Sequence, residues 1–196
     1  MKMMRTIMAV FALTVIANVA MAAGNLRVDI LPLTSERAVV AISNNAESSF
    51  EISIENAGGE VVYYKATEGA VTDYRKVYDF SKLGTGDYTL TVSIDGAKST
   101  REFSIAGNGI NVGTMKSIVD PYFSFDKNIL RVAYLNYPGE KMNLMIYDGS
   151  NLVYNKALEN TFSVNEGLNL SKLNAGNYDV VLAAGNEVFD YSVEVK

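Results

Sequence analysis

Cysteine, histidine and tryptophan are all absent from this 196-residue sequence. The lack of cysteine excludes disulfides, thiol nucleophiles, thiolate metal sites and a lipid-modified cysteine behind a leader segment. The lack of histidine removes the commonest general base and metal ligand, so a Ser-His-Asp triad cannot form and zinc or copper sites are excluded. Paired carboxylates could still hydrolyse glycosides, but the Asp and Glu residues are scattered, mostly at turns. We therefore expect no enzyme, no cofactor and no metal site.

The N-terminal segment has the pattern of a secretory signal peptide. Lys2 and Arg5 form a positive region, residues 7–17 form a largely apolar run, and Ala20-Met21-Ala22 is a small-x-small cleavage pattern. The alternative is a membrane anchor, but a spanning helix needs about 20 apolar residues and this run is shorter. We assign residues 1–23 to the signal peptide. We expect an exported protein in the periplasm, at the cell surface or outside the cell, without a transmembrane span in the mature chain.

Acidic residues outnumber basic ones by 22 to 17, which gives a net charge of −5. Removal of the leader would take away two basic residues and no acidic ones, so the charge would become −7. A surface of this sign repels phosphate backbones. We therefore do not expect nucleic acid as a partner.

The chain after the leader has the apolar–polar alternation that is typical of strands. Residues 50–54 and 88–92 show it most clearly, and Val, Ile, Thr and Tyr, which suit a pleated and half-buried surface, dominate such runs. Gly-, Asn- and Asp-rich turn signals separate them, often at the spacing of a sandwich or barrel. We predict fourteen strands, near 26–30, 37–43, 49–54, 60–66, 74–79, 87–93, 100–105, 115–119, 129–135, 141–147, 151–157, 165–170, 177–183 and 187–195.

An internal repeat organises these strands. The pattern S-K-L-x-x-G-x-Y occurs at residues 81–88 and again at 171–178. Upstream, Val62-Tyr63-Tyr64-Lys65-Ala66 matches Val153-Tyr154-Asn155-Lys156-Ala157. The order of the other strands and turns is the same in both copies. The repeat predicts a first domain at 24–107 and a second at 114–196, joined by a flexible linker at 108–113.

Seven short strands in each copy predict two tandem antiparallel β-sandwich domains of the immunoglobulin-like or fibronectin III-like kind. The repeated motif has a structural interpretation in this fold. Its Leu closes one end of the core, its Gly permits a positive φ, and its Tyr (Tyr88 or Tyr178) packs inward and hydrogen-bonds nearby backbone, as in a tyrosine corner. The alternative is that these two tyrosines bind a ligand.

The strand, Gly-turn and L-x-x-G-x-Y pattern resembles a known family. It is similar to the C-terminal sorting domains of the Por-type secretion system of Bacteroidetes, and to small secreted Bacteroidetes β-sandwich proteins of unknown function. Residues 146–156 and 170–195 carry the resemblance, together with the parallel set in the first copy. It implies the β-sandwich fold and an exported protein.

Aromatic residues are the remaining candidates for a binding site. Adjacent side chains on a strand face opposite sides, so one of Tyr63 and Tyr64 is expected to be exposed. Tyr122, Phe123 and Tyr137 form a second group. Exposed tyrosines can anchor a protein interface or stack on a sugar ring. We expect an interaction or structural module that contacts another exported or cell-surface protein. The alternative is a carbohydrate-binding protein whose partner is a glycan.

Overall fold

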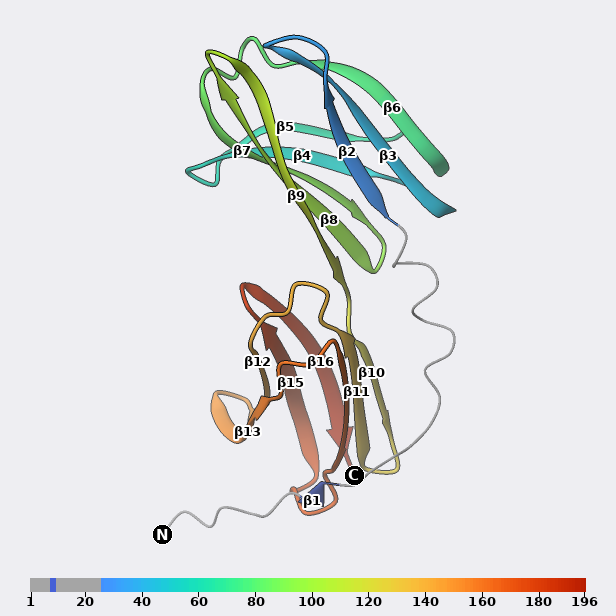
Figure 1. Cartoon of the computed structure of the whole chain (residues 1–196). Coiled ribbons are helices and arrows are strands. Elements are labelled where there is room, and N and C mark those ends of the chain that lie inside the picture. Colours follow the sequence, from blue (N-terminus) through green and yellow to red (C-terminus); the bar gives the residue numbers. More distant parts are fainter. Residues whose placement is uncertain (1–7, 10–25) are drawn as a thin grey trace. The chain divides into compact units, whose positions relative to one another are not determined.

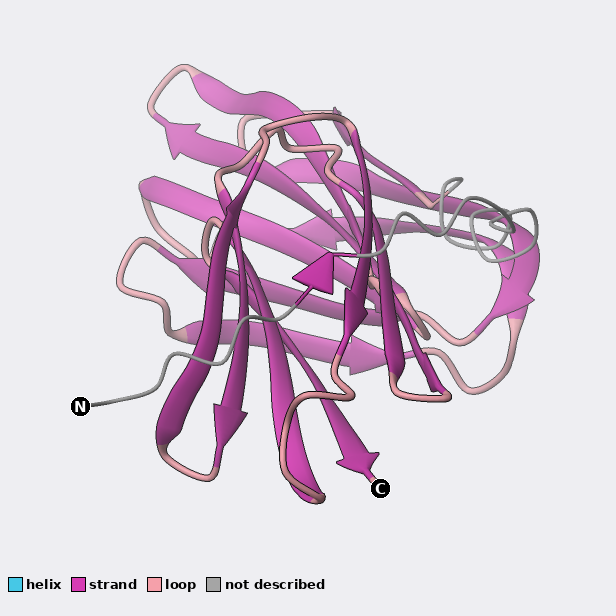
Figure 2. Ribbon diagram, turned by 90° about the horizontal axis from the view of Figure 1, so that it is seen from below, coloured by secondary structure: helices cyan, strands magenta, loops and turns pink. Residues whose placement is uncertain are grey.

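The computed structural model describes Met8–Ala9 and residues 26–196 (Figure 1). The predicted signal peptide at 1–23 lies outside the described residues, apart from the two-residue strand β1 (Met8–Ala9), which pairs antiparallel with β14 (Ser163–Asn169). Strands joined by turns and loops make up the described residues (Figure 2). No helix in this part of the chain is long and apolar enough to cross a membrane. The predicted all-β fold class is confirmed.

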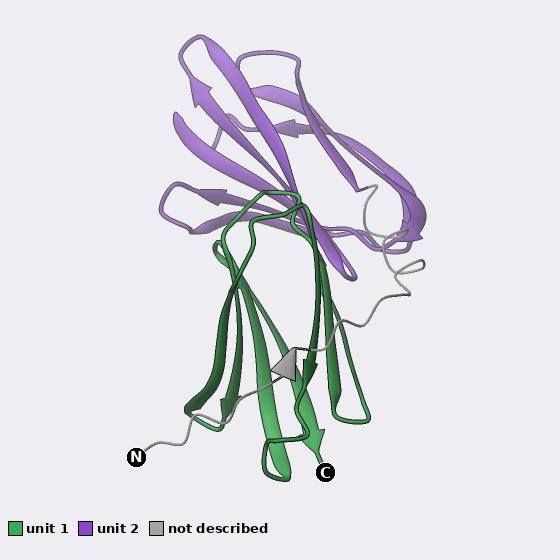
Figure 3. Ribbon diagram, turned by 60° about the horizontal axis from the view of Figure 1, so that its bottom comes forward, with its two compact units in different colours: residues 1–17, 120–196 green, residues 18–119 purple. Residues whose placement is uncertain are grey.

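The chain divides into two compact units (Figure 3). Unit 2 comprises residues 18–119 and corresponds to the first predicted domain. Unit 1 comprises residues 120–196 together with 1–17 and corresponds to the second. Each unit has its own cluster of buried apolar side chains.

Unit 2 is a sandwich of two antiparallel sheets. Its strands are β2 (Arg27–Pro32), β3 (Arg37–Ser48), β4 (Glu51–Asn56), β5 (Val61–Ala66), β6 (Val71–Asp79), β7 (Gly86–Ile94), β8 (Ala97–Ala106) and β9 (Gly109–Val119). One sheet has the order β2-β3-β6 and the other β5-β4-β7-β8-β9. Both sheets alternate buried and exposed residues because one face of each covers the core.

Unit 1 repeats this arrangement. Its strands are β10 (Tyr122–Asp126), β11 (Ile129–Leu135), β12 (Met142–Asp148), β13 (Asn151–Leu158), β14, β15 (Gly176–Ala184) and β16 (Glu187–Val195). The sheet orders are β1-β14-β11-β10 and β13-β12-β15-β16. In chain order, β10 to β16 therefore match β2 to β8, with the same neighbours in each sheet. The seven matching antiparallel strands, joined by β9 in unit 2 and by β1 in unit 1, lie in two packed sheets in each unit. Both units are therefore immunoglobulin-like or fibronectin III-like sandwiches, as predicted.

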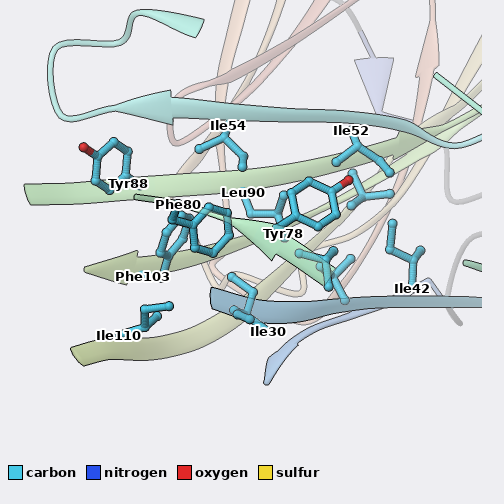
Figure 4. Close-up of a cluster of buried hydrophobic side chains, with 14 of the residues drawn as sticks. Ile30, Ile42, Ile52, Ile54, Tyr78, Phe80, Tyr88, Leu90, Phe103 and Ile110 are labelled. Atoms are coloured by element: carbon cyan, nitrogen blue, oxygen red, sulfur yellow. The ribbon is translucent and has the colours of Figure 1, made fainter. Parts of the chain in front are cut away.

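The core of unit 2 is filled from both sheets (Figure 4). The ring of Phe103 on β8 stacks on Tyr88 of β7 at 5.5 Å and on Phe80 at 5.1 Å. Phe80 directly follows β6 of the other sheet, so this aromatic stack joins the two layers. Ile52 and Leu90 lie in the same core and are fully buried. Burial of each such side chain contributes roughly 1.5–3 kcal/mol, which makes this packing the main source of stability.

Strand register shows how closely the two units match. Ile54 pairs with Tyr63 in unit 2, and Ile146 pairs with Tyr154 in unit 1. In both units the next pair skips one residue on the edge strand, which leaves a β-bulge at the same point. A bulge at an identical position supports the repeat that the sequence predicts.

The joint between the units differs from the predicted linker at 108–113. Residues 107–108 form a two-residue hairpin loop, because Ala106 pairs with Gly109, and β9 then runs along β8 as far as Val119. Gly-Asn suits such a tight turn, which explains why these residues close a hairpin instead of forming a flexible joint. The predicted strand at 115–119 is the end of β9 in unit 2. The strand of unit 1 that corresponds to β2 is β10 (Tyr122–Asp126), where the sequence predicted none.

Candidate functional site

The repeated S-K-L-x-x-G-x-Y motif is a tyrosine corner in both units. The hydroxyl of Tyr178 donates to the carbonyl of Asn174 at 3.0 Å, and the hydroxyl of Tyr88 donates to the carbonyls of Leu83 and Gly84. Both tyrosines are buried and begin the strand that follows the crossing from one sheet to the other. The structural interpretation of the motif is confirmed, and these rings are not exposed to a ligand.

A second pair of hydrogen bonds completes the corner. The backbone N–H of Ser81 donates to the Asp79 carboxylate at 3.0 Å, and that of Ser171 donates to the Asn169 side chain at 2.9 Å. The Ser81 hydrogen bonds lower the pKa of Asp79. The corner therefore fixes the loop between β6 and β7 and its counterpart between β14 and β15.

The five aromatic residues considered as a binding site divide between the two units and between packed and exposed positions. Tyr63 points inward and meets Tyr78 edge-on at 5.2 Å, while Phe123 stacks on Tyr191 at 5.2 Å with nearly parallel rings. Both are therefore part of the packing of their units.

The other three, Tyr64, Tyr122 and Tyr137, are exposed. Tyr64 lies on edge strand β5 of unit 2 with 60% of its surface exposed. Tyr122 lies at the start of β10, and Tyr137 lies in the loop after β11.

Tyr137 has an aromatic partner that the sequence reasoning missed. Its ring meets Phe162 edge-on, with centroids 5.2 Å apart, and the two side chains are 42% and 59% exposed. We call this pair the aromatic platform. The two residues are 25 positions apart in the sequence, and they meet because the backbone N–H of Asn136 donates to the carbonyl of Phe162 at 2.8 Å. No local pattern in the sequence signals this contact.

A buried asparagine holds the loops under the aromatic platform. The side-chain amide of Asn136 donates to the carbonyl of Glu140 at 2.9 Å and to Oδ1 of Asn160 at 3.1 Å. Its own Oδ1 accepts from the Glu140 N–H at 3.0 Å, and Asn160 donates to the carbonyl of Gly139. The loop after β11 and the loop before β14 are thus tied together through one residue. An exposed aromatic pair on rigid loops loses little conformational entropy when it binds.

Tyr134, two residues before Asn136, is close enough to three carboxylates for their charges to affect its hydroxyl. Burial raises the pKa of its hydroxyl, and the negative charges of Glu187, Asp120 and Glu140 raise it further. These three side chains come from three separate loops or strand ends of unit 1. The Tyr134 hydroxyl therefore stays protonated beyond the ordinary tyrosine range.

The platform has no counterpart in unit 2. Strand pairing matches Asn136 with Asn44, so Tyr137 corresponds to Asn45 and Phe162 to Thr72. Both of these residues are polar and exposed. The fold therefore does not require aromatic side chains at these two positions.

Unit 2 contains a shallow groove of about 480 Å³ on its five-stranded sheet. Side chains that face outward from neighbouring strands line it, including Thr89, Glu102 and Asn111. Glu102 forms an exposed ion pair with Lys116 at 3.4 Å. Across residues 8–9 and 26–196, no group of three or more Asp or Glu side chains is placed to hold a metal ion.

Part of the chain matches a known protein family. Residues 35–106, which comprise most of unit 2, match the family described as "Secretion system C-terminal sorting domain". The resemblance predicted from the sequence is confirmed for this stretch. No curated protein matches the chain.

Several solved structures show weak similarity to this chain. The FN1–FN3 domains of chicken CNTN1 have 10% identity and a TM-score of 0.24, and the match covers 86% of this chain and 66% of that one. The titin Ig tandem A164–A165 has 15% identity and a TM-score of 0.26, with coverage of 88% and 95%. The BSP domain of a biofilm-associated protein has 14% identity and a TM-score of 0.27, and the match covers 87% of this chain but only 29% of that one. The fold of this protein is established by its own strand pairing.

Proposed function

We propose that this protein is an exported, non-enzymatic module that works by binding another exported or cell-surface protein. The match of residues 35–106 to a secretion sorting domain supports export. Immunoglobulin-like and fibronectin-like sandwiches are shared by many cell-surface domains and are generally non-enzymatic, which supports an interaction role at the level of the fold.

The observation that carries the proposal is the aromatic platform. Tyr137 and Phe162 expose large rings on loops that Asn136 holds in place. Aromatic anchors at the centre of a contact provide most of the binding energy of many protein interfaces. Large exposed rings favour a partner whose contact surface is apolar.

Site-specific photo-crosslinking, in cells of the organism that makes this protein, tests this function. A photoreactive benzophenone amino acid replaces Phe162 in the full chain, and a matched variant carries it at Thr72, the equivalent position of unit 2. We expect one discrete exported protein to be crosslinked from position 162, absent from position 72, and lost when Tyr137 is also changed to Ala. If both positions yield the same products, or if Tyr137→Ala leaves the crosslink intact, the platform is not the contact surface.

A further inference from the structure

The outward face of the β2-β3-β6 sheet in unit 2 carries an exposed apolar row. Val28 and Ile30 of β2 are buried, so Leu31 points outward, and the same alternation turns Val39 of β3 and Val77 of β6 outward. These three outward residues lie side by side, because Leu31 pairs with Val39 and Val39 pairs with Val77.

The side chains at the two ends of this row are exposed to solvent and not covered by another part of the unit. Leu31 is 50% exposed and Val77 is 41% exposed, and Leu33, which follows on the chain, is 57% exposed. Contiguous apolar side chains on a surface mark interaction sites more often than isolated ones do. We call the outward-facing side of β2, β3 and β6 the outer face.

Unit 1 shows that the sandwich does not need an apolar row at this point. The residues at the positions of Leu31, Val39 and Val77 are Ser124, Arg131 and Gly167, which are paired in the same register on β10, β11 and β14. Two of these are polar and the third has no side chain. The apolar row is therefore a property of unit 2, not a requirement of the shared fold.

The two rows of outward residues next to the apolar row each carry one negative and one positive side chain. The neighbouring row across the sheet is Asp29–Ala41–Arg75, with the negative charge on β2 and the positive charge on β6. The row beyond it is Arg27–Ser43–Asp73, with the signs exchanged. Each row therefore has a small residue at its centre and opposite charges at its two ends.

We propose that the outer face binds the outer face of a second copy of this chain. A two-fold axis that runs parallel to the strands, along β3, places β2 of one copy opposite β6 of the other. Leu31 then meets Val77 of the second copy, Asp29 meets its Arg75, and Arg27 meets its Asp73. Every one of these contacts occurs twice, and a two-fold interface is self-complementary in this way.

The remaining features of the outer face agree with this pairing. Ala41 and Ser43 lie on the axis, where small side chains let two sheets approach to the packing distance of about 10 Å. Asp29 forms an ion pair with Arg101 of β8 at 3.2 Å within one copy, so in the dimer its carboxylate is shared between Arg101 and Arg75 of the second copy. Arg37, at the end of the axis, lies opposite Asp79 in the strand register, and its positive charge acts on that carboxylate within one copy.

Analytical ultracentrifugation of the purified protein tests the dimer. We expect the wild type to sediment at twice the chain mass, and Val77→Glu to raise the dimer dissociation constant more than about tenfold, since two charges are placed against apolar side chains. Ser124→Glu, at the position in unit 1 that matches Leu31, is the control and leaves the dimer unchanged. Circular dichroism of each variant shows that the fold is retained.

Reversing the charge of Arg27 or of Asp73 tests whether these two residues meet across the proposed two-fold axis. Asp73→Arg places two positive charges opposite one another across the axis, and Arg27→Asp places two negative charges there, so each variant alone is expected to be monomeric. In an equimolar mixture the two variants present opposite charges to one another, and the dimer returns as a heterodimer. A monomeric wild type, or a mixture that stays monomeric while the wild type dimerises, overturns the proposal. A dimer insensitive to Val77→Glu overturns it as well.

Discussion

Asn44 and Asn136 occupy equivalent positions in the two units, and both are buried. Oδ1 of Asn136 accepts a hydrogen bond from the Glu140 N–H, whereas Oδ1 of Asn44 has no hydrogen-bond partner among the described residues. The side-chain amide of Asn44 donates only to the Ala46 carbonyl and the Ser48 hydroxyl, four residues away at most. The same residue thus connects two distant loops in unit 1 and stabilises a single local turn in unit 2.

Replacement of these asparagines should affect the two units unequally. Asn136→Ala removes the side-chain hydrogen bonds to Glu140 and Asn160 but keeps the backbone bond to Phe162, and we expect it to lower the free energy of unfolding by about 2–3 kcal/mol. Asn44→Ala leaves only local groups unpaired and should cost about 1 kcal/mol. Urea denaturation measures both values. Equal losses for the two variants would contradict the difference in their hydrogen bonding.

The tyrosine corners should contribute to the stability of their own units. Tyr178→Phe removes the hydrogen bond to Asn174 and keeps the ring, so a loss of about 1 kcal/mol is expected. Amide hydrogen exchange should become faster in β15 and β16 and stay unchanged in β7 and β8. Tyr88→Phe should give the reverse pattern. Faster exchange in both units with either variant would mean that the corners do not act locally.

Alkaline pH should destabilise unit 2 through Tyr78. Burial raises the pKa of Tyr78 far above its ordinary value of 10.0, and the hydrogen bond with the Tyr74 hydroxyl, 3.0 Å away, adds to the shift. The native state therefore keeps this hydroxyl neutral, while the unfolded chain loses the proton above pH 10. The stabilisation is complete below pH 10 and falls as the pH rises further.

Tyr78→Phe is the variant that checks this pH effect. Its free energy of unfolding should fall less steeply above pH 10 than that of the wild type, measured by denaturant titration at successive pH values. Curves that run parallel for the two proteins would show that Tyr78 does not cause the alkaline loss.

Gly185 and Gly149 allow steric crowding to be separated from backbone strain. Both have positive φ angles, +59° and +55°, that disfavour a side chain by about 1–2 kcal/mol. A Cβ at Gly185 would lie 2.8 Å from the Glu140 side chain, whereas nothing lies within 4 Å at Gly149. We expect Gly185→Ala to be more destabilising than Gly149→Ala in thermal unfolding. If the two variants lose the same stability, the Glu140 side chain moves aside freely.

The sequence predicted the strands well because the core pattern repeats with period two. Phe50, Ile52 and Ile54 alternate with polar residues, and each lies buried where the alternation placed it. Residues 122–126 were missed as a strand, because their aromatic side chains suggested a binding site and not a sheet edge. The sequence predicts a flexible linker at 108–113, whereas residues 107–108 close a hairpin, because glycine and asparagine are common both in hairpins and in joints.

The candidate surfaces were harder to predict than the fold. Tyr63 and Tyr64 are adjacent in sequence, and only the packing shows that Tyr63 meets Tyr78 while Tyr64 stays exposed. Phe162 becomes a partner of Tyr137 through a backbone hydrogen bond between two loops. Such contacts depend on how distant segments pair, and a local pattern contains no information about that pairing.

The sequence by itself determined that the chain is built from two copies of one β-sandwich without cysteine or histidine chemistry. It did so because burial on one face of each strand imposes a period that can be read residue by residue. The tertiary structure decided which outward residues lie next to one another. Leu31, Val39 and Val77 are far apart in the chain and become one row only through strand register, as do the charges beside them. Inward positions are apolar in both copies because they must pack in a core. Outward positions do not pack in a core, so their residues differ between the copies.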